Sequence, residues 1–227
     1  MQRSAEGHQA AQPEAYTLVA NGIKNESDLA QQVALVDQMI ALGVDAIVIA
    51  PADSRALVPA LVRALQAGIQ VVNIDNRLAT EVLAEYDVQI PYIGPSNREG
   101  ARLVAEYVLA KHELASEVFI LEGIPTAANA KQRKAGFEEA IATAGMTLVD
   151  SQSAAWDQTQ AAQVTAAVLN RYPNLRIILA ANDNMALGAA SAVNLADRTD
   201  LSIAGFDNIS AVHPLMREGR IDATVEQ

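Results

Sequence analysis

The stretch IILAANDNMALGAA, residues 177–190, runs from an apolar segment directly into Asn, Asp and Asn at positions 182–184 and then into an alanine-rich segment. The first part has the composition of a short interior strand, and the last part that of a helix. A buried strand that ends on amides and a carboxylate places polar groups at the edge of a sheet. The stretch therefore indicates a strand and helix unit with a polar junction.

The same alternation extends along the whole chain. Strands are predicted at 16–22, 45–51, 70–76, 88–95, 117–123, 146–153, 177–183, 201–208 and 221–227. Helices are predicted at 26–42, 54–67, 97–111, 129–144, 158–171, 184–196 and 210–218, and Gly43, Gly68, Gly145 and Gly219 follow four of their ends. Apolar strands joined by helical crossovers predict an α/β fold, with parallel sheets covered by helices on both faces.

One irregular stretch, residues 77–97, interrupts this alternation. Gly94 and Pro95 lie near its end, and we interpret them as the point where the chain passes from a first domain, 1–94, to a second that begins at 95. In doubly wound sheets, ligands bind beyond the carboxyl ends of the strands. The residues that end each strand are therefore the candidates for function.

Composition excludes several classes of protein. The 227 residues carry a net charge of -11, which would repel phosphate backbones and anionic lipid, so nucleic acid is not an expected partner. Cysteine is absent, which excludes thiolate chemistry and disulfides. No apolar run is long enough to span a membrane, and the polar first residues show no signal peptide.

Short polar side chains gather at the predicted strand ends. They are Asp53, Asp75, Asn76, Ser96, Asn97, Trp156, Asp157, Asn182, Asp183, Asp207, Asn208 and Gln227. Carboxylates and amides form paired hydrogen bonds with vicinal hydroxyls, as a sugar site requires. Each Asp or Asn is equally consistent with a helix cap or a turn, and we interpret Asp53, Asp183, Ser96 and Asn97 as structural.

The single tryptophan, Trp156, lies at a predicted strand-to-helix turn, where its ring could cover the apolar face of a sugar. Few basic residues lie near the strand ends. Arg77, Lys131 and Arg133 could fork onto sugar oxygens or could equally be solvated residues of a first helical turn.

Motifs of enzymes are missing. The sequence has no G-x-G-x-x-G, no P-loop, no G-x-S-x-G and no H-E-x-x-H, and its three histidines lie away from the strand ends. We expect no catalytic residue, no metal and no cofactor. Asp75 and Asp207 could in principle act as an acid and base on a glycoside, but nothing else supports hydrolysis.

From about residue 5 to 227 the chain resembles the type I periplasmic solute-binding proteins, in particular the ribose- and allose-binding group of ABC transporters. The resemblance rests on GVDAIVIAPADSRAL, GIQVVNIDNRL, NAKQRKAGFEEAI, AAWDQTQAAQV, ILAANDNMALGAASAV, IAGFDN and REGRIDATVEQ, in this order and spacing. It implies two lobes, 1–94 and 95–226, joined by hinge crossings near 94–95 and at 227.

The resemblance also implies a set of sugar contacts. The matching positions are Asp75, Trp156, Asn182, Asp207, Gln227 and the flanking Phe206, with Lys131 in the apparent place of an arginine and Arg133 beside it. Asn76 stands where ribose binders carry arginine, and Ala50 where they carry asparagine, so the identity of the sugar stays open.

In function, the resemblance implies a monomer that closes on a monosaccharide and delivers it to a membrane permease, without inserting into the membrane itself. The full-length protein is expected in the periplasm or at the cell surface. The family begins with a strand, and ends with a helix and strand, that find no match here, so we expect a truncated chain with an incomplete first lobe and weak sugar binding.

Two alternatives remain open at the level of sequence. The first is the effector domain of a lac-repressor-type regulator, which shares the two-lobed fold and would need a basic helix-turn-helix. The second is an enzyme on a flavodoxin-like sheet, which would turn over a glycoside.

Overall fold

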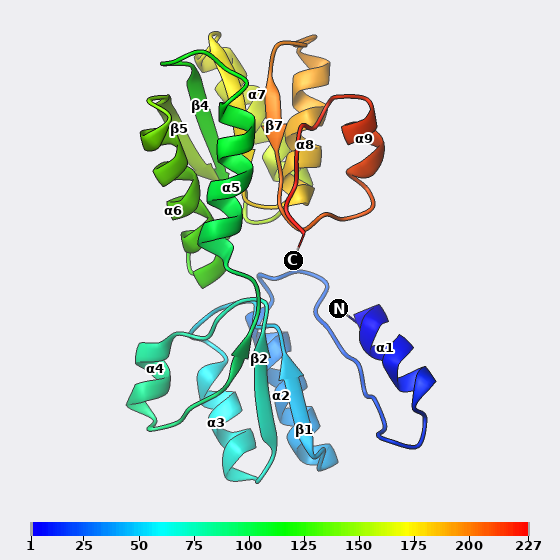
Figure 1. Ribbon diagram of the computed structural model, residues 1–227. Coiled ribbons are helices and arrows are strands. Elements are labelled where there is room, and N and C mark those ends of the chain that lie inside the picture. Colours follow the sequence, from blue (N-terminus) through cyan, green and yellow to red (C-terminus); the bar gives the residue numbers. More distant parts are fainter. Residues whose placement is uncertain (1, 227) are drawn as a thin grey trace.

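The computed structural model describes residues 2–226 and contains two β-sheets, each in its own lobe (Figure 1). The first sheet has the strand order β1-β2-β3 and the second the order β5-β4-β6-β7, and every pair of neighbouring strands is parallel. The predicted α/β fold with parallel sheets is confirmed.

The elements follow the predicted alternation closely. The strands are β1 (Ala46–Ile49), β2 (Gln70–Ile74), β3 (Tyr92–Ile93), β4 (Glu117–Glu122), β5 (Thr147–Ser153), β6 (Leu175–Ala180) and β7 (Ser202–Ala204). The helices are α1 (Gln2–Ala11), α2 (Leu29–Leu42), α3 (Val58–Gln66), α4 (Thr80–Glu85), α5 (Asn97–Leu109), α6 (Ala128–Thr143), α7 (Gln158–Arg171), α8 (Asp183–Leu195) and α9 (His213–Arg217). The four glycines noted at helix ends all have a positive φ, as a left-handed last turn requires.

Each lobe has a hydrophobic core of its own. In the first lobe, Leu57 and Leu61 of the α3 region are fully buried against β1 and β2. In the second lobe, Phe119 of β4 and Phe137 of α6 are fully buried, α5 packs on α6, and α7 packs on α8. Two separate cores allow each lobe to stay folded while the angle between the lobes changes.

The strand predicted at 16–22 is absent. This segment runs as irregular chain, and Val19 within it is half exposed. A strand is stable only when its backbone groups pair with a neighbour, and among the described strands none lies beside this segment, because β1 pairs with β2 alone. Helices on both faces were predicted, but one face of the sheet is uncovered at β1, where Val48 is 64% exposed while Ile47 and Ile49 on the other face are buried.

The strand predicted at 221–227 is reduced to an extended segment. It lies beside β7, where Ala204 and Ala223 form a single bridge and the Asp207 amide donates to the Val225 carbonyl over 2.8 Å. No helix was predicted where α1 lies, and α4 lies within the stretch that we expected to be irregular.

Candidate functional site

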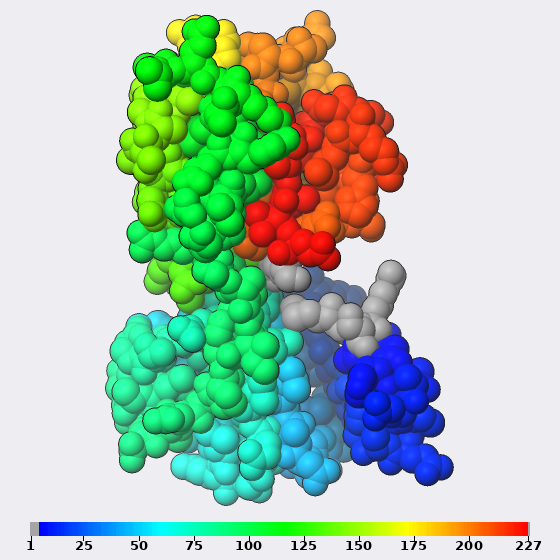
Figure 2. All heavy atoms as spheres, viewed as in Figure 1, coloured from blue at the N-terminus to red at the C-terminus, as the bar shows by residue number. Residues whose placement is uncertain are grey.

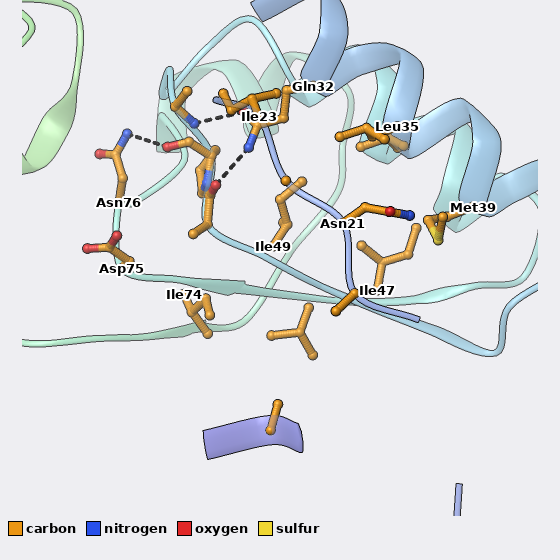
Figure 3. Close-up of a pocket in the computed structure, with 18 of the residues that line it drawn as sticks. Asn21, Ile23, Gln32, Leu35, Met39, Ile47, Ile49, Ile74, Asp75 and Asn76 are labelled. Carbon is orange, nitrogen blue, oxygen red and sulfur yellow. Dashed lines mark hydrogen bonds between the residues drawn. The ribbon is translucent and has the colours of Figure 1, made fainter. Parts of the chain in front are cut away.

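A cavity of about 1310 Å³ extends between the two lobes at the carboxyl ends of the strands. The space-filling view shows the molecule narrowing between the lobes (Figure 2). The polar residues of its lining include Glu26, Asp75, Asn76, Asn129, Arg133, Trp156, Asn182 and Asp207. Figure 3 shows its first-lobe side, with Asp75 and Asn76 at one end and the apolar Leu35, Met39 and Ile47 at the other.

Asp75 follows the last residue of β2 and has a left-handed backbone, with φ at 61°. The Tyr92 hydroxyl donates to the Asp75 carbonyl over 2.7 Å, and the Arg77 guanidinium lies 4.6 Å from the centre of the Tyr92 ring. Burial raises the pKa of Asp75, and the positive charge of Arg133 across the cavity partly offsets this. The carboxylate is therefore held by its backbone and faces the second lobe.

Asn76 was predicted as a ligand contact, but most of its hydrogen-bonding capacity is used within the protein. Its side-chain N–H donates to the Pro51 carbonyl over 2.9 Å, and its side-chain oxygen accepts from the Ser54 hydroxyl and from the Asn129 amide. Only one N–H remains for a ligand. Its position in the lining therefore reflects a contact between the lobes more than a contact with a solute.

Arg133 is the centre of the second-lobe half. Its guanidinium is 2% exposed and donates to the Asn97 side chain over 2.8 Å, to the Ala181 carbonyl over 2.7 Å and to Asp207 over 3.2 Å. Burial lowers the pKa of Arg133, and the charges of Asp207 and Asp75 act in the opposite direction. Its rigid position favours directional hydrogen bonds to a ligand.

Lys131 was predicted beside Arg133 as the second possible basic contact. It lies two residues earlier on α6, where its side chain is exposed and lies outside the cavity lining. A helix turns 100° per residue, so positions 131 and 133 cannot both face the cavity. The structure thus separates the two candidates and brings only Arg133 to the site.

Trp156 lies in the turn between β5 and α7. Ala155 and Trp156 both have positive φ, at 49° and 66°, and the next residue, Asp157, caps α7 by accepting from the Gln160 amide over 2.7 Å. The indole covers Gly123, where an added methyl carbon would lie 2.1 Å from the ring. The turn therefore holds the Trp156 ring in the cavity wall. Only glycine fits at position 123, directly beneath the ring.

Asn182 and its neighbour Asp183 have different roles at the start of α8. Asn182 lines the cavity and also caps the helix, because its side-chain oxygen accepts from the Met185 amide over 2.9 Å. Asp183 is fully buried and accepts from the Thr224 hydroxyl and the Ile209 amide, which fastens the last described segment to the sheet. The structural interpretation of Asp183 agrees with these contacts.

Phe206 and Asp207 follow β7. Asp207 lines the cavity with φ at 111°, whereas Phe206 is fully buried and supports Arg133 from behind, with the guanidinium 3.8 Å from the ring centre. The last predicted contact, Gln227, lies outside the described residues.

Three contributors to the site were missed from the sequence. Glu26 lines the cavity, and burial together with the charge of Asp75 raises its pKa while Arg133 lowers it. Asn97 was interpreted as a helix cap but instead holds Arg133, and Tyr92 supports the backbone of Asp75. The polar run NGIKNESD before α2 is the one sequence signal that could have indicated Glu26.

At its polar end the site combines three carboxylates, one guanidinium and one indole with the amides of Asn76, Asn129 and Asn182. Carboxylates accept hydrogen bonds from hydroxyls, and a guanidinium donates to ring or hydroxyl oxygens, so the set matches a neutral polyol. Within residues 2–226 no group of three or more acidic or histidine side chains is placed to hold a metal ion. No helix in the described part of the chain is long and apolar enough to cross a membrane.

The full chain, residues 1–227, matches the family described as "Periplasmic binding protein domain". It is 48% identical over 228 residues to the D-ribose/D-allose-binding protein of Pseudomonas aeruginosa, a match that covers 100% of this chain and 72% of that protein.

Two crystal structures of ABC transporter solute-binding proteins have similar folds. One, from Burkholderia multivorans with an unknown ligand, has a TM-score of 0.98 at 46% identity over 100% of this chain and 81% of that chain. The other, from Actinobacillus succinogenes with bound D-allose, has a TM-score of 0.88 at 35% identity over 96% of this chain and 76% of that chain. These relatives favour a role in sugar import over a role as a transcription regulator.

Proposed function

The chain belongs to the periplasmic binding protein family, and we propose that it is the solute-binding component of an ABC transporter for a monosaccharide. The observation that supports this most directly is the pairing of Asp75 from the first lobe with Arg133 and Asp207 from the second around one cavity. Both lobes contribute side chains to this one space, so a sugar that contacts both would stabilise the closed form.

We assign the sugar contacts to Asp75, Arg133, Trp156, Asn182 and Asp207. The two carboxylates would accept hydrogen bonds from hydroxyls, Arg133 would donate to ring or hydroxyl oxygens, and the Trp156 ring would cover the apolar C–H face. The names of the relatives make D-ribose and D-allose the first sugars to test.

We propose further that residues 1–94 and 95–226 move as two units, with the hinge in the segment between β3 and α5. The closed form would be the one that a permease recognises, at the outer face of the cytoplasmic membrane. Binding without chemical change of the sugar is the expected activity, as in the relatives, which are named as binding proteins.

We expect the affinity of this 227-residue chain to be millimolar or weaker. The cavity of about 1310 Å³ exceeds the volume of about 300–1,000 Å³ that is typical of small-molecule sites. Its excess lies at the apolar end, along Leu35, Met39 and Ile47, where a monosaccharide leaves space for water.

Amide and indole NMR shifts recorded during titration with D-ribose and with D-allose test the proposal. We expect saturable shifts at Trp156 and Asn182 that Asp75→Asn and Asp207→Asn each weaken. Saturable binding much tighter than millimolar would contradict the expected weakness but support the function. Unchanged spectra with both sugars, and with a panel of other neutral pentoses and hexoses, would refute sugar binding.

A further inference from the structure

Helix α6 has no capping side chain at its N-cap position, although the Asn129 side chain in its first turn accepts from the Ala130 amide over 2.8 Å. Its N-cap residue is Ala127, which has no side-chain oxygen to accept from the first helical amides. Those amides nevertheless have partners. Ala128 donates to the Ser54 hydroxyl over 2.9 Å, and Asn129 donates to the Asn76 side-chain oxygen over 3.2 Å. Both acceptors belong to the first lobe, so the helix is capped from across the cleft.

The two capping residues also form hydrogen bonds within the first lobe. The Ser54 hydroxyl donates to Asn76 over 3.3 Å, and the Asn76 side chain donates in turn to the Pro51 carbonyl over 2.9 Å. Ser54 and Asn76 are only 4% and 3% exposed, because α6 covers them. Separation of the lobes would expose both residues and the helix amides together.

A neighbouring contact crosses the cleft at the same place. Burial alone would raise the pKa of Asp53, but the amides of Ala56 and Arg55 and the side chain of Thr126 together hold that pKa below its ordinary value. Thr126 immediately precedes the N-cap of α6. Asp53, Ser54 and Asn76 thus form a single first-lobe surface that fits the start of this helix.

We propose that Ser54 and Asn76 act as an interlobe cap that stabilises the closed form whether or not a sugar is present. The effect of the cap on affinity rests on the proposed function, because it requires that closure of the lobes accompanies sugar binding. A cap that exists only when the lobes meet raises the population of the closed form, and a ligand that needs that form then binds more tightly. Asn76 is accordingly a positioning residue, which influences affinity while its side-chain oxygen accepts from Ser54 and Asn129 and not from the sugar.

Distances between spin labels in the unliganded protein test the cap directly. The chain has no cysteine, so Gln66→Cys on α3 and Asn170→Cys on α7, both at exposed positions, give one labelled pair. We expect Ser54→Ala to lower the ratio of closed to open forms about fivefold, the usual effect of one lost cap. As a matched control, Asp157→Ala removes a cap that lies entirely within the second lobe, so it should leave the distance distribution unchanged.

A second variant separates the cap from a general loss of stability. Ala127→Ser gives α6 a capping hydroxyl of its own, so the open form no longer leaves the amides without a side-chain partner. We expect this variant to open the protein as Ser54→Ala does, while its melting temperature rises instead of falling. Distances unchanged in both variants, or shifted equally by Asp157→Ala, would overturn the proposal. Because no sugar is present, these results are independent of whether sugar binding itself is found.

Discussion

The guanidinium carbon of Arg133 lies 3.8 Å from the centre of the Phe206 ring. The Phe206 ring is fully buried behind the guanidinium. The guanidinium also donates to the Asn97 side chain and to the Ala181 carbonyl, and these bonds fix its orientation. A cation against an aromatic face is stabilised by the ring quadrupole even where water is excluded. Phe206 was predicted as a flank of the pocket, and the structure places it as the support of the cation that faces the pocket.

Loss of the Arg133 charge should destabilise the second lobe strongly. Arg133→Met leaves the Ala181 carbonyl without this donor and removes one partner of Asp207, and a buried acceptor that loses its donor typically costs about 1–3 kcal/mol. Urea denaturation would measure the loss in the free energy of unfolding. The control is Arg98→Met, because Arg98 pairs with Glu139 at the exposed surface, where such pairs contribute about 0–1 kcal/mol. Equal losses in the two variants would contradict the central position of Arg133.

Displacement of the Trp156 ring should abolish sugar binding. In Gly123→Ala the new methyl carbon would fall 2.1 Å from the indole, so the ring must leave its place. Because Trp156 is the only tryptophan, its fluorescence emission should shift to the red as the ring becomes exposed. Gly7→Ala on α1 is the matched control, since nothing lies within 4 Å of the added carbon. An unshifted emission in Gly123→Ala would show that the turn is more adaptable than its contacts indicate.

Removal of one hydroxyl from Tyr92 should weaken binding without unfolding the protein. Tyr92→Phe loses the hydrogen bond to the carbonyl of Asp75, whose backbone is left-handed. The Asp75 carboxylate therefore becomes less precisely placed. We expect the dissociation constant for the sugar to rise about two- to tenfold by NMR titration. Tyr86→Phe, on the exposed end of α4, should leave the constant unchanged.

Sugar affinity should fall on acidification at a higher pH than an ordinary carboxyl would cause. Burial raises the pKa of Asp75, and the ionised form accepts stronger, charge-assisted bonds from hydroxyls than the protonated form, so binding weakens as the pH falls through the raised pKa. Stability has the opposite dependence. The native state binds this proton more tightly than the unfolded chain, so the contribution of Asp75 to stability decreases as the pH rises from 3.8 through the raised value.

Asp75→Asn should therefore change stability and sugar affinity in opposite directions at neutral pH. The variant should be more stable than the original chain in thermal unfolding, because it no longer buries an ionised carboxylate, and it should bind sugar more weakly with little dependence on acid. Asparagine tolerates the left-handed backbone at this position, so the fold itself should be undisturbed. A variant that is less stable at neutral pH would show that the Arg133 charge outweighs burial.

Periodicity was sufficient to predict most of the fold, because apolar strands and amphipathic helices each bury their own face. It failed at 16–22, where the alternation was right for a strand but pairing depends on a neighbour that the pattern of that segment cannot specify. The helix α1 was missed because it has no large apolar side chain, and α4 because its 6 residues are too few to show the helical period.

Site residues were predictable where they directly follow the end of a strand. Asp75, Trp156, Asn182 and Asp207 all follow strand ends, and the structure brings them to one cavity. Asn76 and Asn97 show the limit of this argument. Both are amides next to strand or helix ends, but one bonds to the opposite lobe and the other to a buried arginine, and such partners are distant in sequence.

The left-handed backbone at Asp75, Trp156 and Asp207 restricts how the pocket could be redesigned for other solutes. Valine, isoleucine or threonine at these positions would strain the main chain before they altered selectivity. Directed evolution for a new cargo should therefore leave these three residues in place and accumulate changes among their neighbours with ordinary backbone angles.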